Sequence, residues 1–224
     1  MVEISARGIL APSEREQILR AAAALCAERG YGELTVEAIV ERAGSSSERF
    51  GHFFAGLEDC LLAAVNAITA ETLAAVSGAY SPDLSEWDSG LAGIRSILEL
   101  MAAHPDFAYL GYIGSRQMAP KRIFEVYSAA CQMLAAMIER LWEYSQLDVQ
   151  PRAAARAALG GCEALVRAEI VGGRIEQLPR LLPDLVYTAT VPFLGQEEAM
   201  RLARRGRELL AGSEWGADVD PPRV

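Results

Sequence analysis

The chain has 224 residues, of which 51% are hydrophobic and 23% are charged, and its formal net charge is −9. The apolar content excludes low-complexity disorder, and the length allows one large domain or a small domain joined to a larger one. The negative charge argues against a protein that coats nucleic acid along a broad basic face, so any DNA contact has to be local.

The N-terminal part of the chain predicts three helices with sharp boundaries. Apolar residues recur with helical spacing at Ile18, Ala22 and Leu25, and the first helix is expected to end at Gly30. A second helix is expected at 36–42 with Thr35 as its N-cap. After the stop at 43–44, three serines can cap a short third helix, in which the spacing of Phe50, Phe53 and Phe54 turns the aromatic side inward.

Longer helices are predicted for the rest of the chain. The next one spans about 57–79, with its inner side expected at Leu61, Val65, Ile68 and Leu73. Prolines stand near the boundaries of the following segments, where helices start or stop. Further helices are expected at 84–103, 106–117, 120–146, 151–172 and 180–211. No alternating run predicts a strand, so the fold class is all-α.

No motif for catalysis, metal binding or a cofactor is present. The four cysteines never form a CxxC pair, and neither histidine follows a glutamate at the spacing of a di-iron bundle. The patterns of hydrolases, P-loops and dinucleotide sites are missing as well. We therefore expect a protein that is not an enzyme and binds neither metal nor cofactor, with reduced thiols in the cytoplasm.

Neither a membrane segment nor a secretory signal is expected. The longest stretch without a charged residue is Val126–Ile138, which is thirteen residues, whereas a membrane helix needs about twenty mostly apolar residues. The N-terminus carries Glu3 and lacks a basic-then-apolar start.

The segment 34–53 has the spacing and capping of a helix-turn-helix, in which the second helix enters the major groove of DNA. Short motifs in and around it resemble the tetracycline-repressor (TetR) family of transcriptional regulators, closely and in order over residues 13–66. They are REQILRAA at 15–22, ERGY at 28–31, LTVEAI at 34–39, AGSS at 43–46, HFF at 52–54 and EDCLLAA at 58–64. The resemblance implies a DNA-binding head, an all-helical body that dimerises and binds an effector, and a ligand that shifts two heads out of operator register.

This organisation predicts three regions. The DNA-binding domain is expected at 11–57, the effector-binding and dimerisation domain at 58–212, and a flexible tail at 213–224. The expected partners are double-stranded operator DNA, a small apolar effector and a second copy of the chain, with no membrane.

The candidate DNA-binding residues lie at the start of the second helix of the motif and beside it. Arg49 is the candidate for guanine readout, because its guanidinium pairs with O6 and N7. Serines there can bind a phosphate, although plain helix capping is the alternative, and Arg49 can also be a solvated surface side chain. The full candidate set is Thr35, Arg42, Ser45, Ser46, Ser47, Glu48, Arg49, Gly51 and His52.

Two positions depart from the family's pattern. Gly51 stands where the family normally has a tyrosine that touches a phosphate, and Leu57 stands where it normally has a lysine. Residues 1–66 hold six arginines against ten acidic residues, a net charge of −4. Fewer phosphate contacts predict weaker DNA binding with a shallower salt dependence.

Large apolar and aromatic side chains gather in the segment 84–146. At helical spacing such residues pack a core, and the alternative is an apolar cavity with a few polar groups that orient an effector. The candidate effector residues are Trp87, Met101, Tyr109, Tyr112, Arg116, Phe124 and Tyr127.

The last two predicted helices, 151–172 and 180–211, are the candidate dimer interface. Small residues at 153–158 and at Gly160 and Gly161 allow close helix approach, and Pro192 is expected to kink the last helix. Packing within one chain is the alternative.

Two functions from different classes follow. The first is a ligand-responsive regulator, expected to repress by binding a palindromic operator as a dimer. The alternative is a protein of the same fold that binds a small molecule or a protein and has lost strong DNA binding, as the acidic head, Gly51 and Leu57 suggest.

Overall fold

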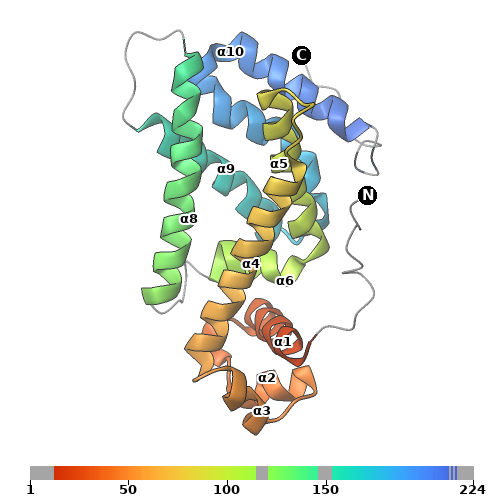
Figure 1. The fold of residues 1–224 in the computed structure, drawn as a ribbon, viewed down its shortest axis with the longest axis vertical. Helices are drawn as coiled ribbons and strands as arrows, with labels where there is room; N and C mark the ends of the chain where they lie inside the picture. The colour runs from red at the N-terminus through yellow and green to blue at the C-terminus, as the bar shows by residue number, and fades with distance from the viewer. Residues whose placement is uncertain (1–12, 115–120, 146–152, 212, 214, 216–224) are drawn as a thin grey trace.

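The computed structural model describes residues 13–114, 121–145, 153–211, 213 and 215. Over these residues the chain is all-α, with nine α-helices, several short 3-10 or π-helical turns and no strand. The predicted fold class is confirmed. The helices form a small head at one end of the molecule and a larger body at the other, connected by the long helix α4 (Figure 1).

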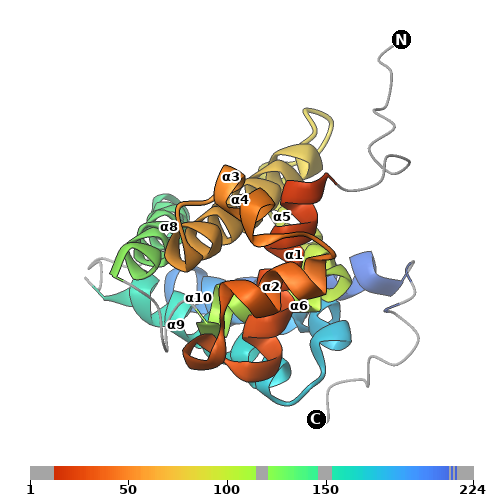
Figure 2. The same ribbon diagram turned by 90° about the horizontal axis from the view of Figure 1, so that it is seen from below.

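The head consists of α1, α2 and α3, which span Glu14–Arg29, Val36–Ala43 and Ser47–Phe53. Ser13 caps α1 in a capping box, because its hydroxyl accepts from the backbone N–H of Glu16 and the Glu16 side chain accepts from the Ser13 backbone. The buried side of α1 packs against α2 and α4, and Figure 2 shows α1, α2 and α3 at the near end of the molecule. The head core consists mainly of the side chains Ile18, Leu25, Cys26, Leu34, Ile39, Phe50, Phe54, Cys60 and Leu61.

Helix α4, Leu57–Ala79, belongs to both parts of the molecule. Its first turns bury Cys60, Leu61 and Val65 in the head core, and its later turns lie along α5. The expected inner residue Leu73 is instead 47% exposed, because only the first half of α4 is covered on that side.

By length and composition alone, α4 is the one described helix that could cross a membrane. Glu71 interrupts the apolar residues of this helix, so it contains no long stretch without a charge. It packs on α1, α5 and α8.

The body helices pack around a second core. Their bounds are Glu86–Ala103 for α5, Pro105–Tyr109 for α6, Lys121–Glu139 for α8, Ala154–Val171 for α9 and Leu182–Ala211 for α10. Short turns join them: a π-helical turn at Leu110–Gly114 and 3-10 turns at Arg140–Tyr144 and Ile175–Leu181. The body core consists mainly of the side chains Leu91, Leu98, Met101, Val166, Ile170, Leu178, Leu182, Val186 and Leu202.

The last helix bends at a different residue from the one predicted. Pro192 lies inside α10 while the backbone stays helical there, and the kink falls at Gly195, with φ 77° and ψ 172°. Such a φ favours glycine because it has no Cβ. The prediction of a kink at Pro192 is therefore wrong by three residues.

Candidate DNA interface and effector cavity

The helix-turn-helix is fixed by local capping. The Thr35 hydroxyl accepts from the Ala38 N–H at 3.2 Å, which starts α2. Gly44 has a left-handed conformation with φ 64°, and the Ser45 N–H returns to the Val40 carbonyl at 2.9 Å, which ends α2. The Ser46 hydroxyl accepts from the Arg49 N–H at 3.2 Å, so Ser46 is the N-cap of α3 among the three serines.

Helix α3 is held by one aromatic side and exposes the other. Phe50 and Phe54 are buried, with ring centroids 5.3 Å apart. The opposite side carries the predicted DNA-binding residues. Ser46, Ser47, Glu48, Arg49, Gly51 and His52 are exposed on α3, as are Thr35 and Arg42 on α2, while Ser45 is half-buried.

Both arginines of the helix-turn-helix form ion pairs with α1. Arg49 donates through Nε and Nη2 to Oε2 of Glu14, at 2.8 Å for Nε, and Ser45 donates its hydroxyl to Oε1 of the same carboxylate at 2.8 Å. The Arg49 guanidinium, together with Ser45, lowers the pKa of Glu14 below its ordinary value. Arg42 pairs with Glu28 near the other end of α1. These contacts were not predicted, because the partners lie 35 and 14 residues apart.

The body contains a cavity of about 390 Å³ between α5, α8, α9, α10 and the turn 140–144. The walls are mostly apolar side chains, while its charged lining residues, Glu86, Arg140 and Glu143, are exposed and therefore lie at its rim. The apolar walls are formed by Trp87, Leu91, Ile94, Leu134, Met137, Ile138, Leu141, Leu159, Leu185, Val186, Ala189 and Leu202.

Two polar contacts shape this cavity. At the rim, the Tyr144 hydroxyl donates to the Glu86 carboxylate, and the Tyr144 ring lies 5.2 Å from the Trp87 ring. In the wall, the Cys162 thiol donates to the Leu185 carbonyl at 3.6 Å, and burial raises the pKa of this thiol to about 11. Cys162 therefore acts as a neutral lining group and not as a thiolate.

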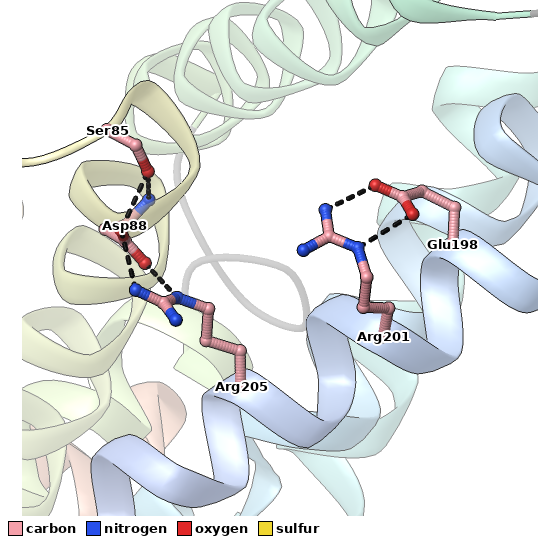
Figure 3. A network of polar contacts seen from close by, with 5 residues as sticks. All are labelled: Ser85, Asp88, Glu198, Arg201 and Arg205. Atoms are coloured by element: carbon pink, nitrogen blue, oxygen red, sulfur yellow. Dashed lines mark hydrogen bonds and ion pairs between the residues drawn. The ribbon is translucent and has the colours of Figure 1, made fainter.

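A polar network fixes the first turn of α5 to α10 next to the rim (Figure 3). The Ser85 hydroxyl accepts from the Asp88 N–H at 3.1 Å and donates to the Asp88 carboxylate at 2.8 Å. Arg205 of α10 donates to the same carboxylate, with 2.9 Å from Nη2 to Oδ2. In contrast, Arg201 pairs with Glu198 of its own helix. The Asp88–Arg205 pair thus positions the turn that carries Glu86 and Trp87.

The comparisons with known proteins concern first the head. Residues 18–64 match the model of the bacterial regulatory proteins of the tetR family. The matched segment contains most of α1, the helix-turn-helix and the first turns of α4. The head therefore matches the DNA-binding domain of the TetR family. In bacterial regulatory proteins of this family, such a domain is a DNA-binding helix-turn-helix.

Solved structures of TetR-like fold cover most of the chain. A TetR-like transcriptional regulator from Rhodococcus sp. RHA1 has a TM-score of 0.63 at 20% identity, over 91% of this chain and 100% of that one. The regulator FadR from Bacillus subtilis in complex with stearoyl-CoA has 0.64 at 17%, over 80% and 98%. A gamma-butyrolactone receptor has 0.62 at 18%, over 88% and 97%. At these identities the likeness is one of fold, and no curated protein matches the sequence.

The structure shows what the two departures from the TetR pattern do. A Cβ added at Gly51 would meet nothing within 4 Å, so no close packing inside the chain requires the glycine. Leu57 begins α4 and packs, half-buried, against the head core, where a lysine would reach outward. The position thus contributes apolar packing in place of a phosphate contact.

The predicted effector residues lie in different places relative to this cavity. Trp87 lines the cavity, whereas Met101 and Tyr109 pack in or against the body core and are not among its lining residues. Tyr112 lies outside it as well, where burial raises its pKa to about 12, and Phe124 is 51% exposed on α8. Arg116 and the side chain of Tyr127 lie outside the described residues. Spacing predicted large apolar residues but not which side of each helix meets the cavity.

Metal binding has no support among the described residues, which hold no group of three or more His, Cys, Asp or Glu side chains that could bind an ion. Cys26 and Cys60 are buried, and burial raises the pKa of the Cys60 thiol to about 12. Both thiols are packed as small apolar groups in the head core.

Proposed function

We propose that this chain is a ligand-responsive repressor, which binds a palindromic operator as a homodimer in the cytoplasm and leaves it when a small apolar effector enters the body. One observation carries the proposal: an exposed helix α3 in the head is combined with an apolar cavity between the body helices. An effector that alters the packing of the body therefore has a route to the head.

The route runs along α4 and α5. The first turns of α4 belong to the head core, and its later turns pack along α5, where a Cβ added at Gly93 would lie 3.5 Å from Val76 of α4. Helix α5 also provides Trp87, Leu91 and Ile94 to the cavity wall. A ligand that displaces α5 would displace α4 as well, because packed helices move as rigid elements.

The rim favours an uncharged effector. Its charged lining residues are two carboxylates, Glu86 and Glu143, and one guanidinium, Arg140. A CoA thioester carries several phosphate charges, which this rim would repel, whereas a lactone is neutral. Among the neighbours, one was solved with stearoyl-CoA and another is a gamma-butyrolactone receptor, and we propose the neutral chemistry for this chain.

The dimer is proposed to form through α9 and α10. Exposed small residues recur along one side of α9 at Ala157, Gly160, Ala164 and Ala168, a spacing that lets a second helix approach closely. Val171 ends this side and is 70% exposed. A two-fold axis there would present two α3 helices to the half-sites of a palindrome.

The test begins with selection of DNA from a random pool by the full chain, followed by fluorescence anisotropy on the recovered duplex. We expect an enriched palindrome and a loss of affinity of about fivefold or more in Arg49→Ala, because a bidentate arginine contact contributes about 1–3 kcal/mol. Thermal-shift measurements with neutral lactones and with acyl-CoA esters then compare the two effector chemistries. Stabilisation by acyl-CoA alone would contradict the neutral effector.

The alternative function, a module of the same fold without strong DNA binding, is favoured by the pairing of Arg42 and Arg49 with carboxylates of α1. It predicts no enriched duplex in the same selection while ligand-induced stabilisation persists. The selection therefore separates the two functions.

A further inference from the structure

The Glu14 carboxylate accepts hydrogen bonds from two groups of the helix-turn-helix, as a DNA phosphate would. Glu14 is the first residue of α1, and its two oxygens accept hydrogen bonds from two groups at the start of the recognition helix. Oε1 accepts from the Ser45 hydroxyl at 2.8 Å, and Oε2 accepts from Arg49, at 2.8 Å from Nε. One carboxylate thus joins the hydroxyl and the guanidinium.

The same two donors are the ones that a phosphate would use. Serine hydroxyls and arginine side chains supply many phosphate contacts of DNA-binding proteins, and guanidinium binds carboxylate and phosphate in the same bidentate way. A phosphate that reached the Ser45 hydroxyl together with Nε and Nη2 of Arg49 would need the position of the Glu14 carboxylate. The two anions therefore exclude each other.

A second pair extends the effect over the helix-turn-helix. Arg42 donates through both terminal nitrogens to Glu28, so the edge that would face a phosphate is taken. Arg42 and Arg49 are the only arginines between residues 30 and 56, and the sequence has no lysine there. Both strong cations of the motif are thus neutralised by α1.

Resting on the proposed function, we propose that Ser45 and Arg49 form a phosphate site. The Glu14 carboxylate occupies this site, and operator DNA has to displace it. The carboxylate sets the affinity for DNA and shields the recognition helix from non-specific duplex. Because the Arg49–Glu14 pair is exposed, its release is easy enough for a cognate operator to achieve.

The experiment compares Glu14→Gln with wild type and with a matched control. Glu16→Gln removes the same charge two residues away and keeps the capping box, because glutamine can replace glutamate there. Anisotropy titrations use the duplex recovered by selection and a 30-base-pair duplex of random sequence, each at several KCl concentrations. Circular dichroism melts verify that every variant is folded.

We expect Glu14→Gln to bind the selected duplex about three- to fivefold more tightly than wild type, with a relatively larger gain on the random duplex, since an exposed ion pair is worth less than a tenfold change in binding. Glu16→Gln should change either affinity by less than about twofold, as a charge without contact to Arg49 is largely screened. In an Arg49→Ala background, Glu14→Gln should lose most of its effect, because the two side chains act as one unit.

Three results would overturn the proposal. Weaker binding by Glu14→Gln would mean that the carboxylate positions Arg49 for DNA, and equal gains in Glu14→Gln and Glu16→Gln would mean a general charge effect. A gain that persists in the Arg49→Ala background would remove Arg49 from the explanation. In each case wild-type binding to the selected duplex leaves the proposed function intact, whereas absence of binding by all variants would contradict both.

Discussion

Gly51 is the residue at which the head departs most from its family, and the structure shows open space around it. It lies inside α3, exposed, and a methyl group in place of its hydrogen would have no neighbour within 4 Å. Glycine in a helix interior is unfavourable because the unfolded backbone has more freedom to lose. The residue therefore weakens α3 without improving the packing of the chain.

We expect Gly51→Ala to raise the free energy of unfolding by about 1 kcal/mol, the difference in helix propensity between the two residues. Denaturant titration followed by circular dichroism measures it. Gly44→Ala provides the opposite control, because φ is 64° there and alanine would be strained by about 1–2 kcal/mol. A destabilised Gly51→Ala would show that the position needs glycine for a reason within the folded chain.

Asp88 gives a second prediction at the residue scale. The Arg205 guanidinium and then the Ser85 hydroxyl hold the pKa of Asp88 below its ordinary value of 3.8. Since the folded-state pKa is lowered, the unfolded chain takes up the proton first as the pH falls. The contribution of this carboxylate to stability is thus fully present above its ordinary pKa and is lost as the pH falls through the folded pKa.

Asp88→Asn should accordingly melt at a lower temperature than wild type at pH 7, and the difference should shrink as the pH falls below the ordinary pKa of 3.8 and through the lowered folded-state pKa. Calorimetry from pH 7 to pH 2.5 checks this. Glu198→Gln is the matched control, because Glu198 pairs with Arg201 on the same helix and joins no second element. A difference between Asp88→Asn and wild type that stays constant with pH would contradict the role of the charge.

Among the elements, those with local signals could be predicted from the sequence and those with distant partners could not. Thr35, Gly44 and Ser46 act on their own neighbours, and the bounds predicted for α2 and α4 agree with the structure to within one residue. The ion pair of Arg49 with Glu14 could not be predicted, because it depends on how α1 lies against α3.

Helix faces in the body show the same limit. The spacing of apolar residues identifies the apolar side of a helix. It does not show whether that side packs in a core or lines a cavity, because the helices of this chain are covered on several sides. Gly160 and Gly161 illustrate this, because the sequence predicts both as small residues of the dimer interface. A Cβ at Gly161 would lie 2.9 Å from Thr188 of α10, so Gly161 serves packing within the chain, while Gly160 is exposed.

The arrangement of elements around the cavity gives a prediction on the effector. Ala189 of α10 lines the cavity and is half-buried. Ala189→Trp should fill much of the space, so we expect DNA binding to persist while neutral lactones no longer raise the melting temperature or release the duplex. Thermal shift and anisotropy measure the two effects, with Ala70→Trp at an exposed position of α4 as control. Unchanged release by the effector in Ala189→Trp would place the effector elsewhere.

At the scale of the whole molecule, the net charge of −9 constrains how DNA can be held. The helix-turn-helix of one monomer has three basic side chains, Arg42, Arg49 and His52. So few side chains neutralise few DNA phosphates, and the salt-dependent part of the affinity is small. Two heads placed by a two-fold axis double those contacts and bind at an effective concentration set by the body. Dimerisation is therefore required for strong binding of this chain to DNA. A variant that no longer dimerises should also lose operator binding.

Ala164→Arg tests that link. Ala164 is exposed in the middle of the small-residue side of α9, so an arginine there would hold a second α9 apart and add a like charge across the two-fold axis. We expect a monomer at micromolar concentration by analytical ultracentrifugation, an unchanged helical circular dichroism spectrum and a loss of operator affinity of at least tenfold. Ala136→Arg, at an exposed position of α8 outside the proposed interface, should remain dimeric and bind as wild type. A dimeric Ala164→Arg would move the interface off this side of α9, and a monomer with full affinity would remove the need for symmetry.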